Sequence, residues 1–122
     1  MVHYRALPLC LLLLISFRSD TLFNNLVKAY QDKNYKKALT LAKAIQDSVE
    51  LTPELFPYFA LVYEKAGEIE QAEDYYRKAC NSEISSSWIY YSAFLRRQGK
   101  YRDAEKIITE RLNSLQDTTA IY

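Results

Sequence analysis

The residues that could support acid–base, nucleophilic or metal chemistry are few in this chain of 122 residues. It has one histidine, His3, and two cysteines, Cys10 and Cys80. A Cys/His zinc site needs about four such ligands, and a nucleophilic triad needs a histidine beside its serine or cysteine. The sequence also contains no glycine-rich loop that could cradle a phosphate. We therefore expect a protein that is not an enzyme and that needs no metal or other cofactor.

Three other groups of side chains invite chemical roles, but each has a structural explanation. Cys80 falls at the end of a predicted helix, where a free cysteine usually behaves as a small packed residue. The three consecutive serines at 85–87 are expected to cap the next helix. Four acidic residues lie near a helix start, where the dipole favours them, and are expected to form a solvated face: Glu68, Glu70, Glu73 and Asp74.

The charge and composition exclude further classes of protein. The formal net charge is only +1 at pH 7, so the chain lacks the basic field of a direct nucleic-acid binder and a polybasic membrane patch. Its 2 glycines and 3 prolines argue against a β-sandwich with many tight turns and favour an all-α fold. Its 11 tyrosines suit helix–helix packing and also surfaces that bind a partner protein.

The first 19 residues differ from the rest of the chain. The uncharged run from Ala6 to Phe17 is too short to span a bilayer, which takes about 20 residues, and matches the apolar region of a signal peptide. Cleavage after Ser16 or Ser19 would place Leu14 or Phe17 where a small residue is preferred. A signal peptide or uncleaved anchor implies the secretory pathway or a membrane. The alternative is an apolar helix on the first hairpin, or an N-terminus without fixed structure, in a cytoplasmic or nuclear protein.

Apolar residues at three- and four-residue spacings predict six helices after this leader. The predicted ranges are 20–32, 35–49, 52–66, 68–80, 88–98 and 101–115. Asp20 or Thr21 can cap the first helix, and Asn34 can cap the second. Pro57 either bends the third helix or delays its start. Residues 116–122 show no pattern and are expected to be frayed.

Three segments of the chain align without gaps: NYKKALTLAKAI (34–45), EIEQAEDYYRKA (68–79) and KYRDAEKIITER (100–111). Three alanines coincide in this alignment, at Ala38, Ala72 and Ala104. A small residue at this point allows two paired helices to approach closely. Three larger residues precede the alanines and are expected to fill the space around that contact: Tyr35, Ile69 and Tyr101. Gly67 and Gly99 share one turn position, where the first repeat has Lys33.

With these repeats the chain resembles the tetratricopeptide repeat family, whose unit is a helix–turn–helix of about 34 residues. The second repeat carries most of the family pattern: Phe56, Phe59, Ala60, Tyr63, Gly67, Ala72, Tyr76 and Ala79. The third keeps Trp88, Gly99, Tyr101 and Ala104, and the first keeps Leu22, Ala29, Tyr35, Ala38, Ala42 and Ile45. The chain departs from the family at Ile84, Leu95 and Arg111. The resemblance covers about three repeats over residues 19–115 and implies a right-handed superhelical stack of three hairpins over residues 20–115.

The resemblance also implies a binding site, because in these arrays the first helix of each hairpin lines a concave groove. The positions carried over are Phe23, Val27, Tyr58, Leu61, Ile89, Tyr90, Arg96 and Arg97. Such a groove suits a hydrophobic helix or an extended peptide of a partner protein, with the arginines facing acidic groups. Members that bind chaperone tails hold a carboxylate with Lys, Asn and Arg, whereas this chain has Phe23, Val27, Tyr58, Ser86 and Tyr90 there. The alternative for each ring is packing between hairpins.

A second hypothesis is a structural subunit of a larger assembly. Residues 88–112 also resemble the half-a-TPR repeat of RNA-processing scaffolds. The sixth helix carries Ile107, Ile108 and Leu112, and only a short tail follows that could cover them. This end could therefore dock on another subunit or on a second copy of the chain. Contact with a membrane is expected only through residues 6–17, if these form an anchor.

Overall fold

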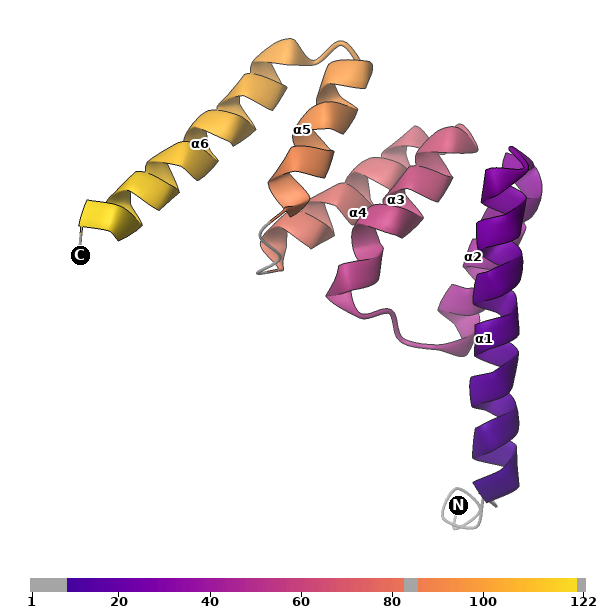
Figure 1. Ribbon diagram of the computed structural model, residues 1–122. Coiled ribbons are helices and arrows are strands. Elements are labelled where there is room, and N and C mark those ends of the chain that lie inside the picture. The colour runs from indigo at the N-terminus through magenta and orange to yellow at the C-terminus, as the bar shows by residue number, and fades with distance from the viewer. Residues whose placement is uncertain (1–8, 83–85, 121–122) are drawn as a thin grey trace. The chain divides into compact units, whose positions relative to one another are not determined.

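The computed structural model describes the backbone of residues 9–82 and 86–120, and the side chains of residues 20–82 and 86–116. All regular elements in these ranges are helices, and no strand is present among them (Figure 1). The elements are α1 (Leu9–Gln31), α2 (Tyr35–Ser48), the short 3-10 helix η2 (Pro53–Leu55), α3 (Phe56–Lys65), α4 (Ile69–Asn81), α5 (Ser87–Arg97) and α6 (Tyr101–Ala120). The predicted all-α fold is confirmed. The chain divides into two compact units, residues 1–51 and 52–122, and each is described by itself.

The first unit is a helical hairpin in which α1 packs against α2. Its buried side chains lie on the facing sides of the two helices: Leu26 and Ala29 on α1, and Ala38, Ala42 and Ile45 on α2. The Asn34 side chain accepts a hydrogen bond of 3.3 Å from the Lys37 backbone N–H, so the predicted cap of the second helix is confirmed.

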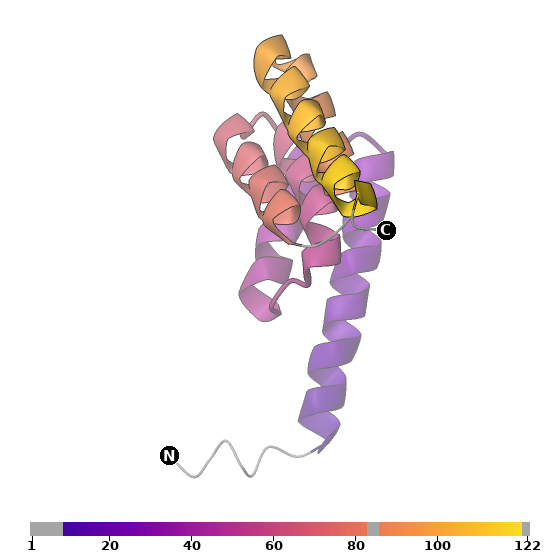
Figure 2. The same ribbon diagram turned by 90° about the vertical axis from the view of Figure 1, so that its left-hand side faces the viewer.

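Helix α1 is longer than the sequence predicted. It runs without interruption from Leu9 to Gln31, so the predicted cap at Asp20 or Thr21 is wrong. No glycine or proline lies within this range, and each residue added to an existing helix gains a backbone hydrogen bond. The N-terminal part of α1 extends well past the end of α2 (Figure 2). The leader at 1–8 and the side chains of 9–19 lie outside the described residues. Among those described, no helix combines the length and apolar character needed to cross a bilayer.

The second unit contains two hairpins that pack on each other. α3 packs against α4, α4 also packs against α5, and α5 packs against α6. The buried side chains that join these helices are Phe59, Ala60, Val62 and Tyr63 on α3, Ala72, Tyr76 and Ala79 on α4, Tyr91, Phe94 and Leu95 on α5, and Ala104 on α6. The ring of Tyr76 lies 4.9 Å from that of Phe94, so α4 and α5 meet through aromatic contacts as well as aliphatic ones.

The two prolines at the start of this unit set the position of α3. Pro53 begins a single 3-10 turn, and Pro57 lies in the first turn of the α-helix that follows at Phe56. Proline is tolerated there because the first N–H groups of a helix have no intrahelical acceptor. Of the two alternatives for Pro57, the structure therefore shows a delayed start and not a bend within the helix.

The three predicted turns share one hydrogen-bond pattern, which is that of a Schellman motif. The residue after the turn donates to the carbonyl five residues earlier in each case: Asn34 N to Ala29 O at 2.9 Å, Glu68 N to Tyr63 O at 2.9 Å, and Lys100 N to Leu95 O at 2.8 Å. The turn residue has a positive φ each time, at +89° for Gly67, +78° for Gly99 and +60° for Lys33. The predicted equivalence of Lys33 with the two glycines is confirmed.

The three aligned alanines are also confirmed as packing positions. Ala38, Ala72 and Ala104 are all buried, each one turn into the second helix of its hairpin. A larger side chain would hold the paired helices apart at this point. Of the larger residues that precede them, Tyr35 and Ile69 are half-buried but Tyr101 is exposed, so the predicted packing role is wrong for Tyr101. None of the described helices covers the Tyr101 ring.

The chain ends in helix where a frayed tail was predicted. α6 continues from Tyr101 to Ala120, so the prediction for 116–122 is wrong as far as Ala120, and residues 121–122 lie outside the described residues. The segment contains no glycine or proline that would stop the helix. At α5, Ser86 occupies the predicted N-cap position, but its hydroxyl makes no capping hydrogen bond.

Candidate protein-interaction surface

The predicted groove residues of the first unit lie on α1. Val27 is exposed, whereas Phe23 is half-buried. In the second unit, Tyr58 and Leu61 lie on α3, where Tyr58 is 62% exposed and Leu61 is half-buried. Because most of the Tyr58 side chain is exposed, it is not packed between the hairpins of its own unit.

The remaining four predicted residues share one helix face, the outer face of α5. Ile89 is 52% exposed, Tyr90 is exposed, and Arg96 and Arg97 follow seven residues later in the last turn. Half-buried Ala93 lies between them on the same face. The buried residues of α5, among them Tyr91 and Phe94, occupy the opposite face. The structure thus brings Ile89, Tyr90, Arg96 and Arg97 together, whereas α3 has α4 as its main neighbour.

A shallow depression lies where α5 ends and α6 begins. It is lined by Ala93, Arg96, Arg97 and Tyr101 and has a volume of about 350 Å³. Tyr101 is 67% exposed and was not predicted to contact a ligand. The sequence assigned it to the packing of the hairpin because it aligns with Tyr35 and Ile69. No local feature of the sequence distinguishes Tyr101 from the two aligned residues that are half-buried.

The second arginine of the pair, Arg97, is held by a carboxylate of the preceding hairpin. Its Nε and Nη2 atoms lie 2.7 Å and 2.8 Å from the two carboxylate oxygens of Glu64, which gives a bidentate ion pair. The Tyr76 hydroxyl donates a third hydrogen bond of 3.0 Å to Glu64 Oε1. Burial of the ring, with the nearby Glu64 charge as a second cause, raises the pKa of Tyr76 well above its usual value.

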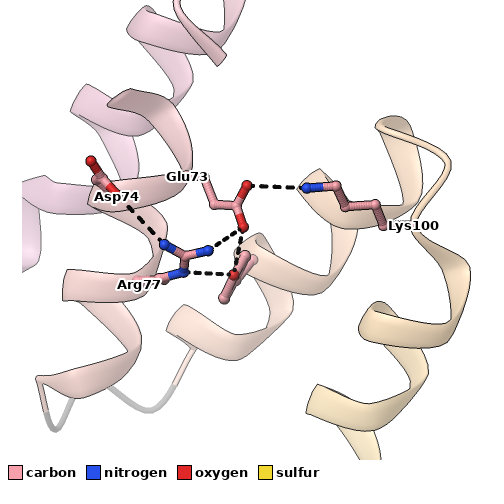
Figure 3. A network of polar contacts seen from close by, with 5 residues as sticks. Glu73, Asp74, Arg77 and Lys100 are labelled. Carbon is pink, nitrogen blue, oxygen red and sulfur yellow. Dashed lines mark hydrogen bonds and ion pairs between the residues drawn. The ribbon is translucent and has the colours of Figure 1, made fainter. Parts of the chain in front are cut away.

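A second carboxylate, Glu73, joins α4 to the next hairpin in the same way (Figure 3). Its Oε1 accepts hydrogen bonds of 2.7 Å from Arg77 Nη2 and 3.1 Å from the Tyr91 hydroxyl, and Lys100 Nζ lies 3.4 Å from Oε2. Arg77 Nε also donates to the Tyr91 hydroxyl at 3.2 Å, and Arg77 Nη1 lies 3.6 Å from Asp74 Oδ1. Burial raises the pKa of Tyr91. These contacts connect α4 to α5 and to the start of α6.

The predicted solvated acidic face is therefore wrong in part. Glu70 and Asp74 are exposed as predicted, but the Glu73 side chain is only 14% exposed and Glu68 is half-buried. Glu73 turns inward because cations of α4 and of the following hairpin compensate its charge. The spacings of Arg77 from Glu73 (i, i+4) and from Asp74 (i, i+3) were the local signals of this network, whereas its ion pair with Lys100 joins residues that are far apart in the sequence.

These ion pairs distinguish the two arginines at the end of α5. The charge of Arg97 is compensated by Glu64. The Arg96 guanidinium, by contrast, makes no hydrogen bond or ion pair with the residues 20–82 and 86–116 whose side chains are described. Arg96 is therefore the arginine of this pair that is available to a ligand.

The remaining candidate chemistry is sparse. Cys80 is half-buried, and burial raises the pKa of its thiol, which makes it less reactive than an exposed cysteine. Within the described part of the chain, no three His, Cys, Asp or Glu side chains cluster in a way that could hold a metal ion.

Comparison with models of protein families and with curated proteins finds no match for this chain. The resemblance to tetratricopeptide repeats therefore rests on the residues and turns described above.

Proposed function

We propose that the chain is a tetratricopeptide-like module that binds a hydrophobic or helical peptide segment of another protein, without catalysis. The three matching Schellman turns and the three buried alanines support a repeat built from equivalent hairpins. In this proposal the hairpins stack as a right-handed superhelix, and the first helix of each hairpin faces the ligand.

The observation that carries the proposal is the exposure of large apolar side chains on these first helices. Val27 on α1, Tyr58 on α3, and Ile89 and Tyr90 on α5 are all exposed. α2 and α4, the second helices of the first two hairpins, have no exposed large apolar side chain among their described residues. Tyrosine rings lose little rotamer freedom when they are covered, which makes them effective anchors for a peptide.

The test is selection of a random 12-residue peptide display library on the immobilised full-length chain, followed by anisotropy titration of the selected peptides. Replacing Tyr58 and Tyr90 by Ala should weaken their binding by about 10- to 100-fold, since each buried anchor ring contributes about 1–2 kcal/mol. The matched control replaces Leu112 and Leu115, which are exposed on α6, by Ala. Unchanged affinity in the tyrosine variant, with far-UV circular dichroism intact, would contradict the proposal.

A second candidate function is a structural subunit that docks on a larger assembly through α6. The observation in its favour is that Leu112 and Leu115 are exposed on the terminal helix of the repeat. If α6 is a docking face, the Leu112→Ala and Leu115→Ala changes, and not those at the tyrosines, should remove binding. Sedimentation of the full-length chain gives a separate measurement, because self-association through α6 should disappear when both leucines are replaced by Lys.

A further inference from the structure

We propose that the outer face of α5 and the adjacent Tyr101 bind an acidic–apolar peptide segment, whose carboxylate is held by Arg96. This inference rests on the proposed function and adds the chemistry of the partner. The outer face of α5 is defined here as Ile89, Tyr90, Ala93, Arg96 and Arg97.

The outer face of α5 changes character along the helix. Ile89 and Tyr90 make its first turn apolar, Ala93 leaves a low point in the middle, and Arg96 and Arg97 make its last turn cationic. A ligand that lies along this face would therefore meet apolar surface at one end and positive charge at the other. A purely apolar segment would leave the arginines unpaired, and a purely acidic one would not use Ile89 and Tyr90.

The charge at the cationic end is not cancelled inside the protein. Glu64 compensates Arg97, and Glu73 lies 3.4 Å from Lys100, but the Arg96 guanidinium has no acidic partner among the described residues. The nearest acid in the sequence on the α6 side, Asp103, does not line the depression. The positive N-terminal end of α6 begins at Tyr101, beside Arg96, and adds to the attraction for an anion.

The residues that line the depression suit a ligand side chain that combines an aliphatic stem with a carboxylate. Ala93 is the small residue among its four lining residues, and Tyr101 contributes an exposed ring against which an aliphatic stem can pack. Because Glu64 holds Arg97 through Nε and Nη2, that side chain forms a fixed wall. Arg96 retains its full set of donors, and a guanidinium can bind a carboxylate through two parallel hydrogen bonds.

The spacing on α5 predicts the spacing in the ligand. Ile89 and Arg96 are seven residues apart in one helix, which corresponds to about 10 Å along its axis. An extended peptide covers about 10 Å in three residues, and a helical one in about seven. The acidic residue should therefore lie about three positions from the apolar anchor in an extended ligand, or about seven in a helical ligand.

The experiment uses the full-length chain and the peptides from the display selection above. For the strongest binder we compare the peptide with its Glu→Gln (or Asp→Asn) version on the wild-type chain, on Arg96→Gln and on Lys106→Gln. Lys106 is the matched control, because it is exposed on α6 and lies outside the depression. We expect the peptide substitution to weaken wild-type binding about fivefold or more, and to change binding less than about twofold on Arg96→Gln. Lys106→Gln should behave as the wild type does.

The outcomes separate the two proposals. If the selected peptides depend on Tyr58 and Tyr90 but carry no acidic residue, or respond equally to the acid substitution on wild type and Arg96→Gln, this inference is overturned and the proposed function stands. If no peptide is enriched, both are overturned. Circular dichroism of Arg96→Gln should match that of the wild type, since its guanidinium makes no described contact that supports the fold.

Discussion

The ion pair between Glu64 and Arg97 offers a direct measure of how firmly the second and third hairpins are joined. The Glu64 side chain is only 8% exposed and accepts hydrogen bonds from Arg97 and from the Tyr76 hydroxyl. Replacing Arg97 by Gln removes the positive charge that is paired with Glu64. The Glu64 carboxylate then remains largely buried with the Tyr76 hydroxyl as its hydrogen-bond donor. Arg96, the preceding residue, is exposed and makes no described ion pair, so Arg96→Gln is a control with the same chemical change.

The expected size of the effect follows from the burial of the two partners. Removing one member of a fully buried ion pair costs about 3–5 kcal/mol, whereas exposed pairs contribute about 0–1 kcal/mol. The Arg97 side chain is 44% exposed, so water screens the pair and can partly hydrate the carboxylate that remains. We therefore expect Arg97→Gln to lower the free energy of unfolding by about 1–2 kcal/mol, and Arg96→Gln to change it by less than about 0.5 kcal/mol.

Urea unfolding measures this difference with two probes. Trp88, the single tryptophan, lies on α5 and reports the third hairpin by fluorescence, while far-UV circular dichroism reports all helices. In repeat proteins, the stability of each unit depends on its contacts with the neighbouring units. Arg97→Gln should therefore lower the urea midpoint measured by Trp88 fluorescence more than the midpoint measured by circular dichroism. Equal midpoints for Arg97→Gln and Arg96→Gln by both probes would show that the ion pair contributes nothing measurable and would refute this reasoning.

Three further measurements test the turns, the buried hydroxyl and the alanine contact. Lys33→Gly should raise the free energy of unfolding by about 0.5–1 kcal/mol, because it relieves a side chain at φ +60°. Gly67→Ala should lower the free energy of unfolding by a similar amount, since an added Cβ there meets no atom within 4 Å and only the φ of +89° is strained. A lower Tm for Lys33→Gly, or an unchanged or higher Tm for Gly67→Ala, would contradict the equivalence of the turns. The raised pKa of Tyr76 favours its neutral form in the folded state, so its contribution to stability is complete below pH of about 10 and is lost as pH rises above it, by up to about 1.4 kcal/mol per pH unit. Tyr76→Phe should therefore show a smaller loss of stability between pH of about 9.5 and 11 than the wild type, and an identical slope would exclude this cause. Ala72→Leu should cost about 1–3 kcal/mol by overpacking, whereas the same change at exposed Gln71 should cost little, as measured by urea unfolding.

The equivalent turns and the alanine contacts were predictable because they depend on local signals. Gly67 and Gly99 mark two of the turns, the alanines at 38, 72 and 104 mark where paired helices approach, and each glycine lies five residues before its alanine. The cap at Asn34 was also predictable, because its bond joins residues three positions apart. Each of these features depends on a few neighbouring residues, so it can be recognised in the sequence without knowledge of the tertiary structure.

The errors at the two ends of the chain have a common physical cause. Asp20 and Thr21 are good caps, but a cap residue ends a helix only where the backbone leaves the helical conformation, and nothing between Leu9 and Thr21 forces it to do so. The same reasoning applies to the segment that ends at Ala120, which lacks an apolar pattern but also lacks a helix breaker. Pattern alone therefore underestimated both helices.

The surface could be predicted only in part. The resemblance correctly indicated which face of α5 is exposed, as Ile89 and Tyr90 show. The resemblance could not show that Arg97 forms an ion pair within the protein and that Arg96 does not. The partner of Arg97 is Glu64, which lies 33 residues earlier in the sequence and contacts Arg97 only when α3, α4 and α5 have packed. Neither composition nor periodicity indicates that Arg97 has an acidic partner inside the protein and that Arg96 has none.

The pairing of α1 with α2, of α3 with α4 and of α5 with α6 has a kinetic consequence. Each pair is closed by a short turn, so little chain entropy is lost before its contacts form, and folds rich in such local contacts reach the native state in microseconds to milliseconds. During synthesis, which adds about 5–20 residues per second, the second helix of each pair can cover the apolar side of the first almost as soon as it emerges. The time for which an unpaired hairpin face is exposed to aggregation is thus set by the ribosome and not by the folding reaction.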